Sequence, residues 1–157
     1  MSAHLIYHTA PIGALVAWSD GTPQPPARFK RKLSAWQTNN GRGRLVRKEG
    51  ERGMGNVTLS ASFTLHEADH GDGGVIAVRV YRTFSLGSTL RFAILERPAL
   101  GSVRVFDRRG EGAELVHLAP DRQAAEEWLS RHGYPRAVLE EVSADEVGAD
   151  IVEGRAA

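Results

Sequence analysis

The chain contains no cysteine, and this absence excludes several kinds of chemistry at once. Disulfide bonds, thiolate zinc sites and cysteine nucleophiles all require that residue. The longest apolar run covers only residues 10–18, whereas a membrane-spanning helix needs about 20 residues. No Lys or Arg precedes this run, as a secretory signal peptide would require. We therefore expect a cytoplasmic protein without a membrane anchor.

The sequence also lacks the short motifs of several large enzyme classes. It has no G-x-S-x-G elbow, no S-x-x-K, no G-x-x-x-x-G-K-S/T phosphate loop and no G-x-G-x-x-G fingerprint. His4, His8, His117 and His132 are scattered along the chain, and a single His near a strand end is more often packed or exposed than catalytic. These absences favour a protein without enzymatic activity, and no cofactor is predicted.

Length and composition are those of an ordinary soluble protein. The 157 residues are 41% hydrophobic and 25% charged. A chain of about 150 residues buries roughly 70% of the surface that its unfolded form exposes, which is enough for a core without disulfides or metals. Seventeen glycines and seven prolines favour turns and strands. We predict a single α+β domain spanning residues 1–157.

Alternation of apolar and polar residues predicts a central hairpin. Residues 57–65 alternate without a break, and residues 75–86 contain a second alternating run. The polar insert HEADHGDGG separates the two runs and is predicted to be the connecting loop. Further short strands are expected at residues 4–9, 89–95, 102–107, 115–118 and 137–142, with another apolar segment at residues 14–18.

Two segments have the apolar spacing of a helix. Residues 27–39 place Phe29, Leu33 and Trp36 on one face, and residues 121–132 begin at Asp121, a good helix cap. Residues 143–146 have the spacing of a capping box for a last short helix. The predicted fold is a mostly antiparallel twisted sheet of five or more strands, with the two main helices packed on it and a C-terminal β-α-β segment over residues 115–142.

The pattern His66-Glu67-x-x-His70 matches the spacing of zinc hydrolases. That mechanism needs a helix, on which the two His bind zinc while the Glu activates water. Here a strand pattern precedes the motif, and Gly71, Gly73 and Gly74 follow it. We interpret the motif as a solvated hairpin loop, and a zinc-dependent hydrolase with His66 and His70 as ligands remains an alternative.

Charge is distributed unevenly along the chain. Residues 1–60 contain nine Lys or Arg against three Asp or Glu, whereas residues 110–157 contain four against eleven. Phosphate binding needs several cations on one side, with aromatic or guanidinium planes nearby to stack on bases. The candidate basic surface consists of Arg28, Arg31, Lys32, Arg42, Arg44, Arg47 and Lys48. An exposed sheet face is predicted to add Arg79, Tyr81, Arg91 and Arg104.

These residues suggest a non-enzymatic binding or accessory protein that contacts nucleic acid or a complex that handles nucleic acid. An acidic protein surface is the alternative partner, as for a protein-docking inhibitor or an accessory factor of a mobile element, because opposite charges would steer such an encounter. A solvated arginine-rich face without a partner would show the same pattern. DNA, RNA and protein partners, and any oligomeric state, remain open at this point.

Overall fold

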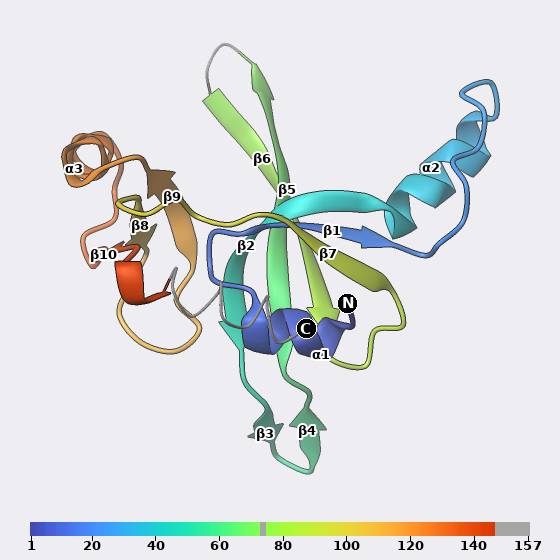
Figure 1. Ribbon diagram of the computed structural model, residues 1–157, viewed down its shortest axis with the longest axis horizontal. Helices are drawn as coiled ribbons and strands as arrows, with labels where there is room; N and C mark the ends of the chain where they lie inside the picture. Colours follow the sequence, from blue (N-terminus) through green and yellow to red (C-terminus); the bar gives the residue numbers. More distant parts are fainter. Residues whose placement is uncertain (73–74, 147–157) are drawn as a thin grey trace.

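A five-stranded antiparallel sheet forms the centre of the molecule (Figure 1). The computed structural model describes the backbone of residues 1–72 and 75–146 and the side chains of residues 1–68 and 78–146. In chain order the elements are α1 (Ala3–Thr9), β1 (Leu15–Ser19), α2 (Lys30–Asn39), β2 (Gly41–Glu49), β3 (Arg52–Met54), β4 (Val57–Leu59), β5 (Ser62–Asp72), β6 (Val75–Ser85), β7 (Arg91–Glu96), β8 (Val103–Phe106), β9 (Leu115–Ala119), α3 (Arg122–Ser130) and β10 (Val138–Glu141). The predicted α+β class is confirmed, while the assignment of residues 1–157 to one domain stays a prediction.

The central sheet has the strand order β6-β5-β2-β1-β7 and curls around an apolar core. Phe84 on one edge strand and Phe92 on the other have ring centroids only 5.2 Å apart. Trp18 and Phe63 from inner strands complete this aromatic cluster. Two edges of a flat sheet would not meet, so the contact shows how strongly the sheet is curled.

Helix α1 covers the core face of this sheet, although residues 4–9 were predicted to form a strand. Ser2 caps the helix, because its hydroxyl accepts a hydrogen bond from the amide of Leu5. Ala3, Ile6 and Ala10 are buried at helical spacing. The prediction was wrong because an apolar segment this short fits a strand and a buried helix equally well.

The predicted central hairpin is present, but both ends of its first strand differ from the prediction. The alternating run at residues 57–65 is divided, because β4 pairs with β3 in a separate two-stranded ribbon and β5 starts only at Ser62. The segment predicted as a loop belongs largely to β5, which extends to Asp72. Strands β5 and β6 therefore form a longer hairpin, with eleven residues in each strand.

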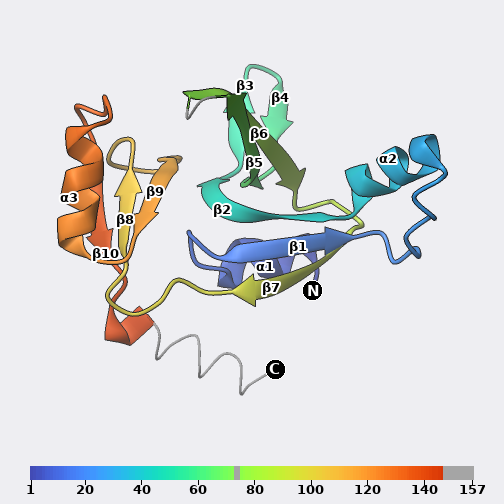
Figure 2. The same ribbon diagram turned by 90° about the horizontal axis from the view of Figure 1, so that it is seen from above.

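A second sheet of three strands, β10-β8-β9, stands at one end of the molecule with α3 against it (Figure 2). Asp121 caps α3 as predicted, accepting a hydrogen bond from the amide of Ala124 at 2.8 Å. Trp128 and Leu129 pack against buried residues of this sheet. Strands β9 and β10 are both antiparallel to β8, which lies between them, so the predicted β-α-β segment has a strand inserted at its centre. The amide of Glu146 bonds the Ser143 hydroxyl at 3.3 Å, as the capping box predicts.

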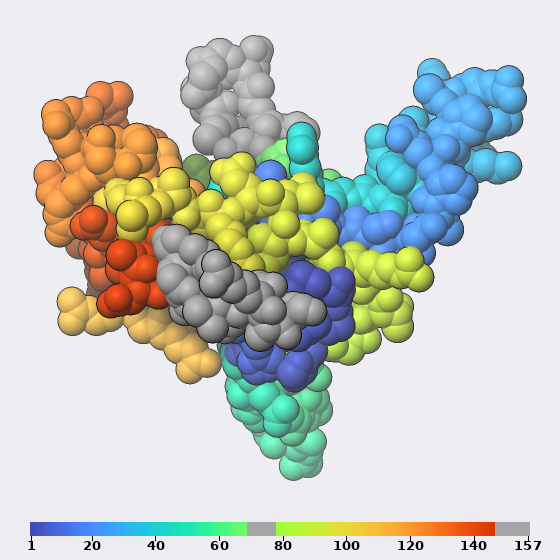
Figure 3. All heavy atoms as spheres, viewed as in Figure 1, coloured from blue at the N-terminus to red at the C-terminus, as the bar shows by residue number. Residues whose placement is uncertain are grey.

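Helix α2 stands at the opposite end and does not pack on the sheet as predicted (Figure 3). None of its residues is buried, and Phe29 just before it is 41% exposed. The indole of Trp36 instead donates a hydrogen bond to the carbonyl of Thr22 in the loop that precedes the helix. We name residues 20–40 the arm, since this segment projects from the body of the molecule. Within the described residues, no helix is both long and apolar enough to cross a membrane.

Candidate functional site

Three polar side chains form a row across neighbouring strands of the central sheet. Arg44 of β2 lies opposite His66 of β5, which in turn lies opposite Tyr81 of β6. Directly opposed residues share one face of a sheet. Their chain neighbours Leu45 and Leu65 face the core, so the row occupies the other face. Sheet register, rather than any local motif, therefore brings the three together.

The geometry of this row is held by specific contacts. The Nη1 atom of Arg44 donates a hydrogen bond to the carbonyl of Gly13 at 2.6 Å, and this bond fixes the guanidinium. The rings of His66 and Tyr81 have centroids 5.3 Å apart. The row thus presents a positioned cation beside an imidazole and a phenol.

The facing wall comes from the second sheet and is built around Trp128 of α3. The ring of His117 on β9 stacks on the indole at 4.7 Å with an interplanar angle of 2°, and the ring of His132 stacks at 3.9 Å and 10°. The Nδ1 atom of His132 lies 2.7 Å from the carbonyl oxygen of Trp128, which fixes the orientation of the imidazole. Tyr134 extends the stack, with its ring centroid 5.6 Å from that of Trp128.

A cavity of about 390 Å³ separates the two walls, and we call it the cleft. Arg44, His66, Arg79 and Tyr81 line one side, while β9, Trp128 and His132 line the other. A neighbouring cavity of about 370 Å³ shares Arg79 and Tyr81 and adds the carboxylates of Asp107 and Glu114. The cleft is therefore basic and imidazole-rich, with an acidic extension at one end.

Burial shifts the pKa of two groups in the cleft. Desolvation lowers the pKa of His117, and the nearby His132 lowers it further. Desolvation also raises the pKa of Tyr81, and Glu114 adds to that increase through a hydrogen bond and its charge. At neutral pH His117 is consequently a neutral ring suited to stacking, and Tyr81 is a protonated phenol suited to hydrogen bonding.

Basic residues lie on the arm and on the strand that leads from it to the cleft. Residues 21–48 contain eight Lys or Arg and no Asp or Glu. Strand β2 follows α2 directly and runs toward the second sheet in both ribbon views (Figures 1 and 2). Arg42 and Arg44 are two residues apart on β2 and so share the face that carries the cleft. We call Arg28, Lys30, Arg31, Lys32, Arg42 and Arg44 the basic stripe.

Only part of the predicted binding surface comes together. Arg44, Arg79 and Tyr81 meet in the cleft, and Arg28, Arg31, Lys32 and Arg42 lie along the basic stripe. Arg47 instead pairs with Glu49 at 3.4 Å, and Lys48 lines a different cavity. The expectation that Arg79, Tyr81, Arg91 and Arg104 share one exposed face is wrong for Arg104, because β8 belongs to the other sheet. Arg91 lies on the outer face of the central sheet, since its neighbour Phe92 faces the core, but its strand β7 is the edge opposite to β6.

Arg91 lies at the base of the arm, where its guanidinium approaches Gly21.

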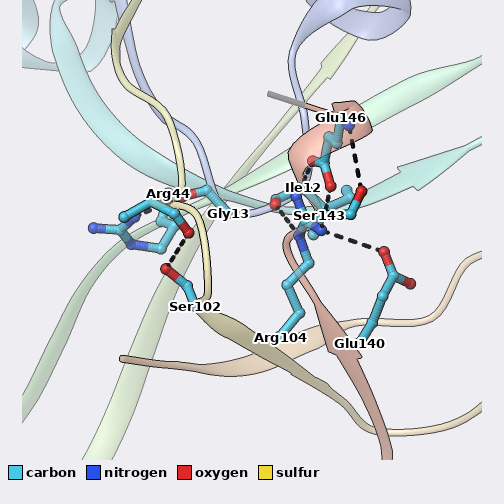
Figure 4. Close-up of polar contacts among 9 residues, drawn as sticks. Ile12, Gly13, Arg44, Ser102, Arg104, Glu140, Ser143 and Glu146 are labelled. Carbon is cyan, nitrogen blue, oxygen red and sulfur yellow. Dashed lines mark hydrogen bonds and ion pairs between the residues drawn. The ribbon is translucent and has the colours of Figure 1, made fainter. Parts of the chain in front are cut away.

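Arg104 is a structural residue and not part of an exposed surface (Figure 4). Only 2% of its side chain is exposed. Its guanidinium donates to the carbonyl of Ile12 at 2.7 Å, to Glu140 at 3.3 Å and to both carboxylate oxygens of Glu146. The arginine thus connects the loop before β1 to β10 and to the helical turn that follows it. Alternation along β8 predicted exposure, but these carboxylates and the carbonyl cover the arginine.

The zinc-hydrolase pattern does not have helical geometry in this structure. Residues 66–70 lie within β5, where positions four residues apart are separated by about 13 Å. The side chain of His70 lies outside the described residues. The described residues contain no group of three or more His, Asp or Glu side chains that could hold a metal ion. His66 belongs to the cleft instead.

The aromatic members of the cleft lining that were not selected from the sequence as binding residues are His66, His117, Trp128 and His132. The spacing of Trp128 and His132, four residues apart at the end of a predicted helix, is a signal that could have placed these two rings side by side. The positions of His66 and His117 depend on how the two sheets meet, so no local pattern could have identified them.

A protein-family model matches most of the chain. The family described as "Uncharacterised conserved protein UCP036055" matches residues 1–146, so the chain belongs to that family. Neither the curated proteins nor the solved structures contain a match to the chain.

Proposed function

We propose that this member of the UCP036055 family is a non-enzymatic module that binds single-stranded nucleic acid. A base enters the cleft, and the backbone phosphates of the strand run along the basic stripe. The observation that carries the proposal is the convergence of Arg44, Arg79 and Tyr81 with the stacked His117 and Trp128 in one cavity.

The chemistry of the cleft suits a nucleotide. Guanidinium groups bind phosphate through charge-assisted hydrogen bonds and also stack on bases. Stacking on an aromatic side chain is worth about 1–3 kcal/mol per base. Tyr81 is 39% exposed, so its ring is accessible to a base, whereas the neutral His117 supplies a flat surface without a competing charge.

The shape of the site favours a single strand over a duplex. A cavity of about 390 Å³ accommodates one base with its sugar but not a double helix. Unstacked bases of single strands can be inserted singly into such pockets. Binding by the basic stripe alone would instead be insensitive to whether the nucleic acid is single- or double-stranded.

Fluorescence anisotropy with labelled single- and double-stranded DNA and RNA at two salt concentrations tests this function. The variant Arg31→Glu/Lys32→Glu reverses two charges of the basic stripe. The matched control Arg52→Glu/Arg122→Glu makes the same change in net charge at two residues whose side chains are each 61% exposed and lie outside the stripe. Each lost phosphate contact should reduce the slope of log affinity against log salt by about 0.7 for single strands.

Tyr81→Ala tests the cleft separately from the basic stripe. Loss of one stacked base should weaken single-strand binding by about 5- to 150-fold, while duplex binding changes little. Equal weakening by the stripe variant and its control would leave only non-specific attraction to a positive protein. Absence of binding to every nucleic acid at low salt would contradict the proposal.

An acidic protein surface is a second candidate partner, because of the arm. The guanidinium of Arg28 and the ammonium of Lys32 lie 4.8 and 5.2 Å from the ring centroid of the exposed Phe29. An exposed aromatic residue between cations is also typical of protein interfaces. A partner recovered from nuclease-treated extract, and lost in Arg31→Glu/Lys32→Glu but retained in Tyr81→Ala, would support this function.

A further inference from the structure

A further cavity, on which nothing in the proposed function depends, is lined by Lys48. Its volume is about 320 Å³, at the lower end of the range for small-molecule pockets. It lies between the end of β2, the loop before β1, and the strands β8 and β10. None of its lining residues lines the cleft. We call it the Lys48 pocket.

A β-bulge places Lys48 in this pocket. The register between β2 and β5 shifts between Leu45 and Arg47, so that Lys48 lies opposite the core residue Phe63. Directly opposed residues share a face, and a bulge changes which face the following residues occupy. The lysine therefore lies on the core face of the sheet, with its ammonium 5.9 Å from the ring centroid of Tyr7.

Lys48 differs from the two other lysines of the chain. Lys30 and Lys32 are exposed on the arm, whereas Lys48 is half-buried. No carboxylate of the described residues lies within ion-pair distance of its ammonium, and burial lowers its pKa. Of the two carboxylates in the pocket lining, that of Glu111 lies against Gly50 and that of Glu140 pairs with Arg104. A half-buried ammonium without an acidic partner is a position where an anionic group would be stabilised.

The rest of the lining indicates what kind of anion fits. Ile12, Phe106 and Val138 supply an apolar wall. The charged lining residues are Lys48, Arg108 and Arg109 opposed by Glu111 and Glu140, which leaves one net positive charge. Arg108 is directed to its own loop, where it donates to the carbonyl of Gly112 at 3.2 Å. A singly charged ligand matches this balance, and the two carboxylates disfavour a doubly charged phosphate.

We propose that the Lys48 pocket binds a small amphipathic carboxylate. The carboxylate pairs with Lys48 and Arg109, and the apolar body of the ligand lies against Ile12, Phe106 and Val138. The left-handed backbone of Gly110 and Gly112, with φ of 102° and 75°, shapes the loop that carries Arg109 to the edge of the pocket. The site is separate from the cleft, so a ligand here and a nucleic acid there can bind independently.

The three lysines make a direct test possible in the unmodified protein. Octanoate is the probe, and trace acetylation of each lysine by acetic anhydride at pH 8 is quantified by mass spectrometry with and without it. We expect octanoate to slow acetylation of Lys48 several-fold at saturation and to leave Lys30 and Lys32 unchanged. Octylamine, which has the same apolar tail and the opposite charge, should give no protection. Unchanged acetylation of Lys48 below the micellar concentration of octanoate, or equal protection of all three lysines, would overturn the proposal.

Isothermal titration calorimetry with Lys48→Met and its matched control Lys30→Met supplies the second measurement. Loss of the charge-assisted bond should weaken octanoate binding at least about tenfold in Lys48→Met, while Lys30→Met binds as the parent protein does. Equal affinity in Lys48→Met and the parent would also overturn the proposal, because the ligand would then be held by the apolar wall alone. Nucleic-acid binding of both lysine variants, measured in parallel, reports on the proposed nucleic-acid site, whose basic stripe includes Lys30, and not on this pocket.

Discussion

Because the guanidinium of Arg104 is buried, we predict that removing the charges of its partners lowers the free energy of unfolding more than removing the arginine itself. The side chain of Arg104 is 2% exposed, whereas those of Glu140 and Glu146 are 59% and 29% exposed. If the carboxylates lose their charge, the arginine remains buried with nothing to neutralise it. If the arginine is replaced by Met, the two carboxylates can regain water.

These exposed fractions determine how much stability each substitution should cost. Removing one partner of a fully buried ion pair costs about 3–5 kcal/mol, and the exposure of the glutamates reduces this to about 3 kcal/mol for Glu140→Gln/Glu146→Gln. Arg104→Met loses mainly the hydrogen bond to the carbonyl of Ile12 and some complementarity of shape, which together cost about 1–2 kcal/mol. The triple variant that carries all three substitutions should be close to Arg104→Met in stability.

Urea unfolding followed by circular dichroism measures the free energy of unfolding of each variant. The exposed pair of Arg122 and Glu126, with side chains 61% and 63% exposed, provides the control, and Arg122→Met and Glu126→Gln should each change stability by less than about 0.5 kcal/mol. A larger loss of stability in Arg104→Met than in the double glutamate variant would refute the argument, because it would show that desolvation of the guanidinium does not decide the balance.

Three further predictions concern packing, the base of the arm and pH. Gly43→Ala should lower the free energy of unfolding by about 1–3 kcal/mol, because a Cβ there would lie 2.8 Å from the backbone oxygen of His66, whereas Gly53→Ala, with no atom within 4 Å, should be nearly neutral; thermal unfolding compares the two. Asn40→Ala should cost about 2 kcal/mol and increase proteolysis of the arm, since the buried amide bonds Asp20 at 3.1 Å and the carbonyl of Trp36 at 2.9 Å; limited trypsin digestion and urea unfolding measure both effects. The lowered pKa of His117 means that the unfolded state binds the proton more readily, so stability should fall as pH decreases through 6.5, and His117→Gln should reduce this dependence in unfolding curves measured across that range.

Local sequence patterns correctly predicted the elements that are determined by residues close together in the chain. The alternating strands at β7, β8 and β9, the cap at Asp121 and the capping box at Ser143 all depend on residues within a few positions of each other. Helix α1 was missed because seven residues do not distinguish the helical period from the strand period. The apolar spacing in α2 was correct, but its aromatic residue Trp36 packs on a nearby loop and not on the sheet.

The candidate site was only partly predictable, because it depends on contacts between distant segments. Charge clustering identified Arg44, and alternation on β6 placed Arg79 and Tyr81 on one face. Alternation on β8 wrongly predicted that Arg104 is exposed, since no strand pattern reveals that two carboxylates from later segments cover it. His117 reaches the cleft only because the second sheet stands beside the hairpin of β5 and β6.

Ultraviolet cross-linking of a uniform single-stranded RNA to the protein, with the linked residues identified by mass spectrometry, tests the central claim most directly. Because Tyr81 is 39% exposed and lines the cleft, we expect the principal cross-link at this residue, with additional links near Trp128 and loss of the principal link in Tyr81→Ala. The matched variant Tyr7→Phe, at a tyrosine outside the cleft, should leave the pattern unchanged. Cross-links confined to the arm, or none at all under conditions where the RNA binds, would contradict the account.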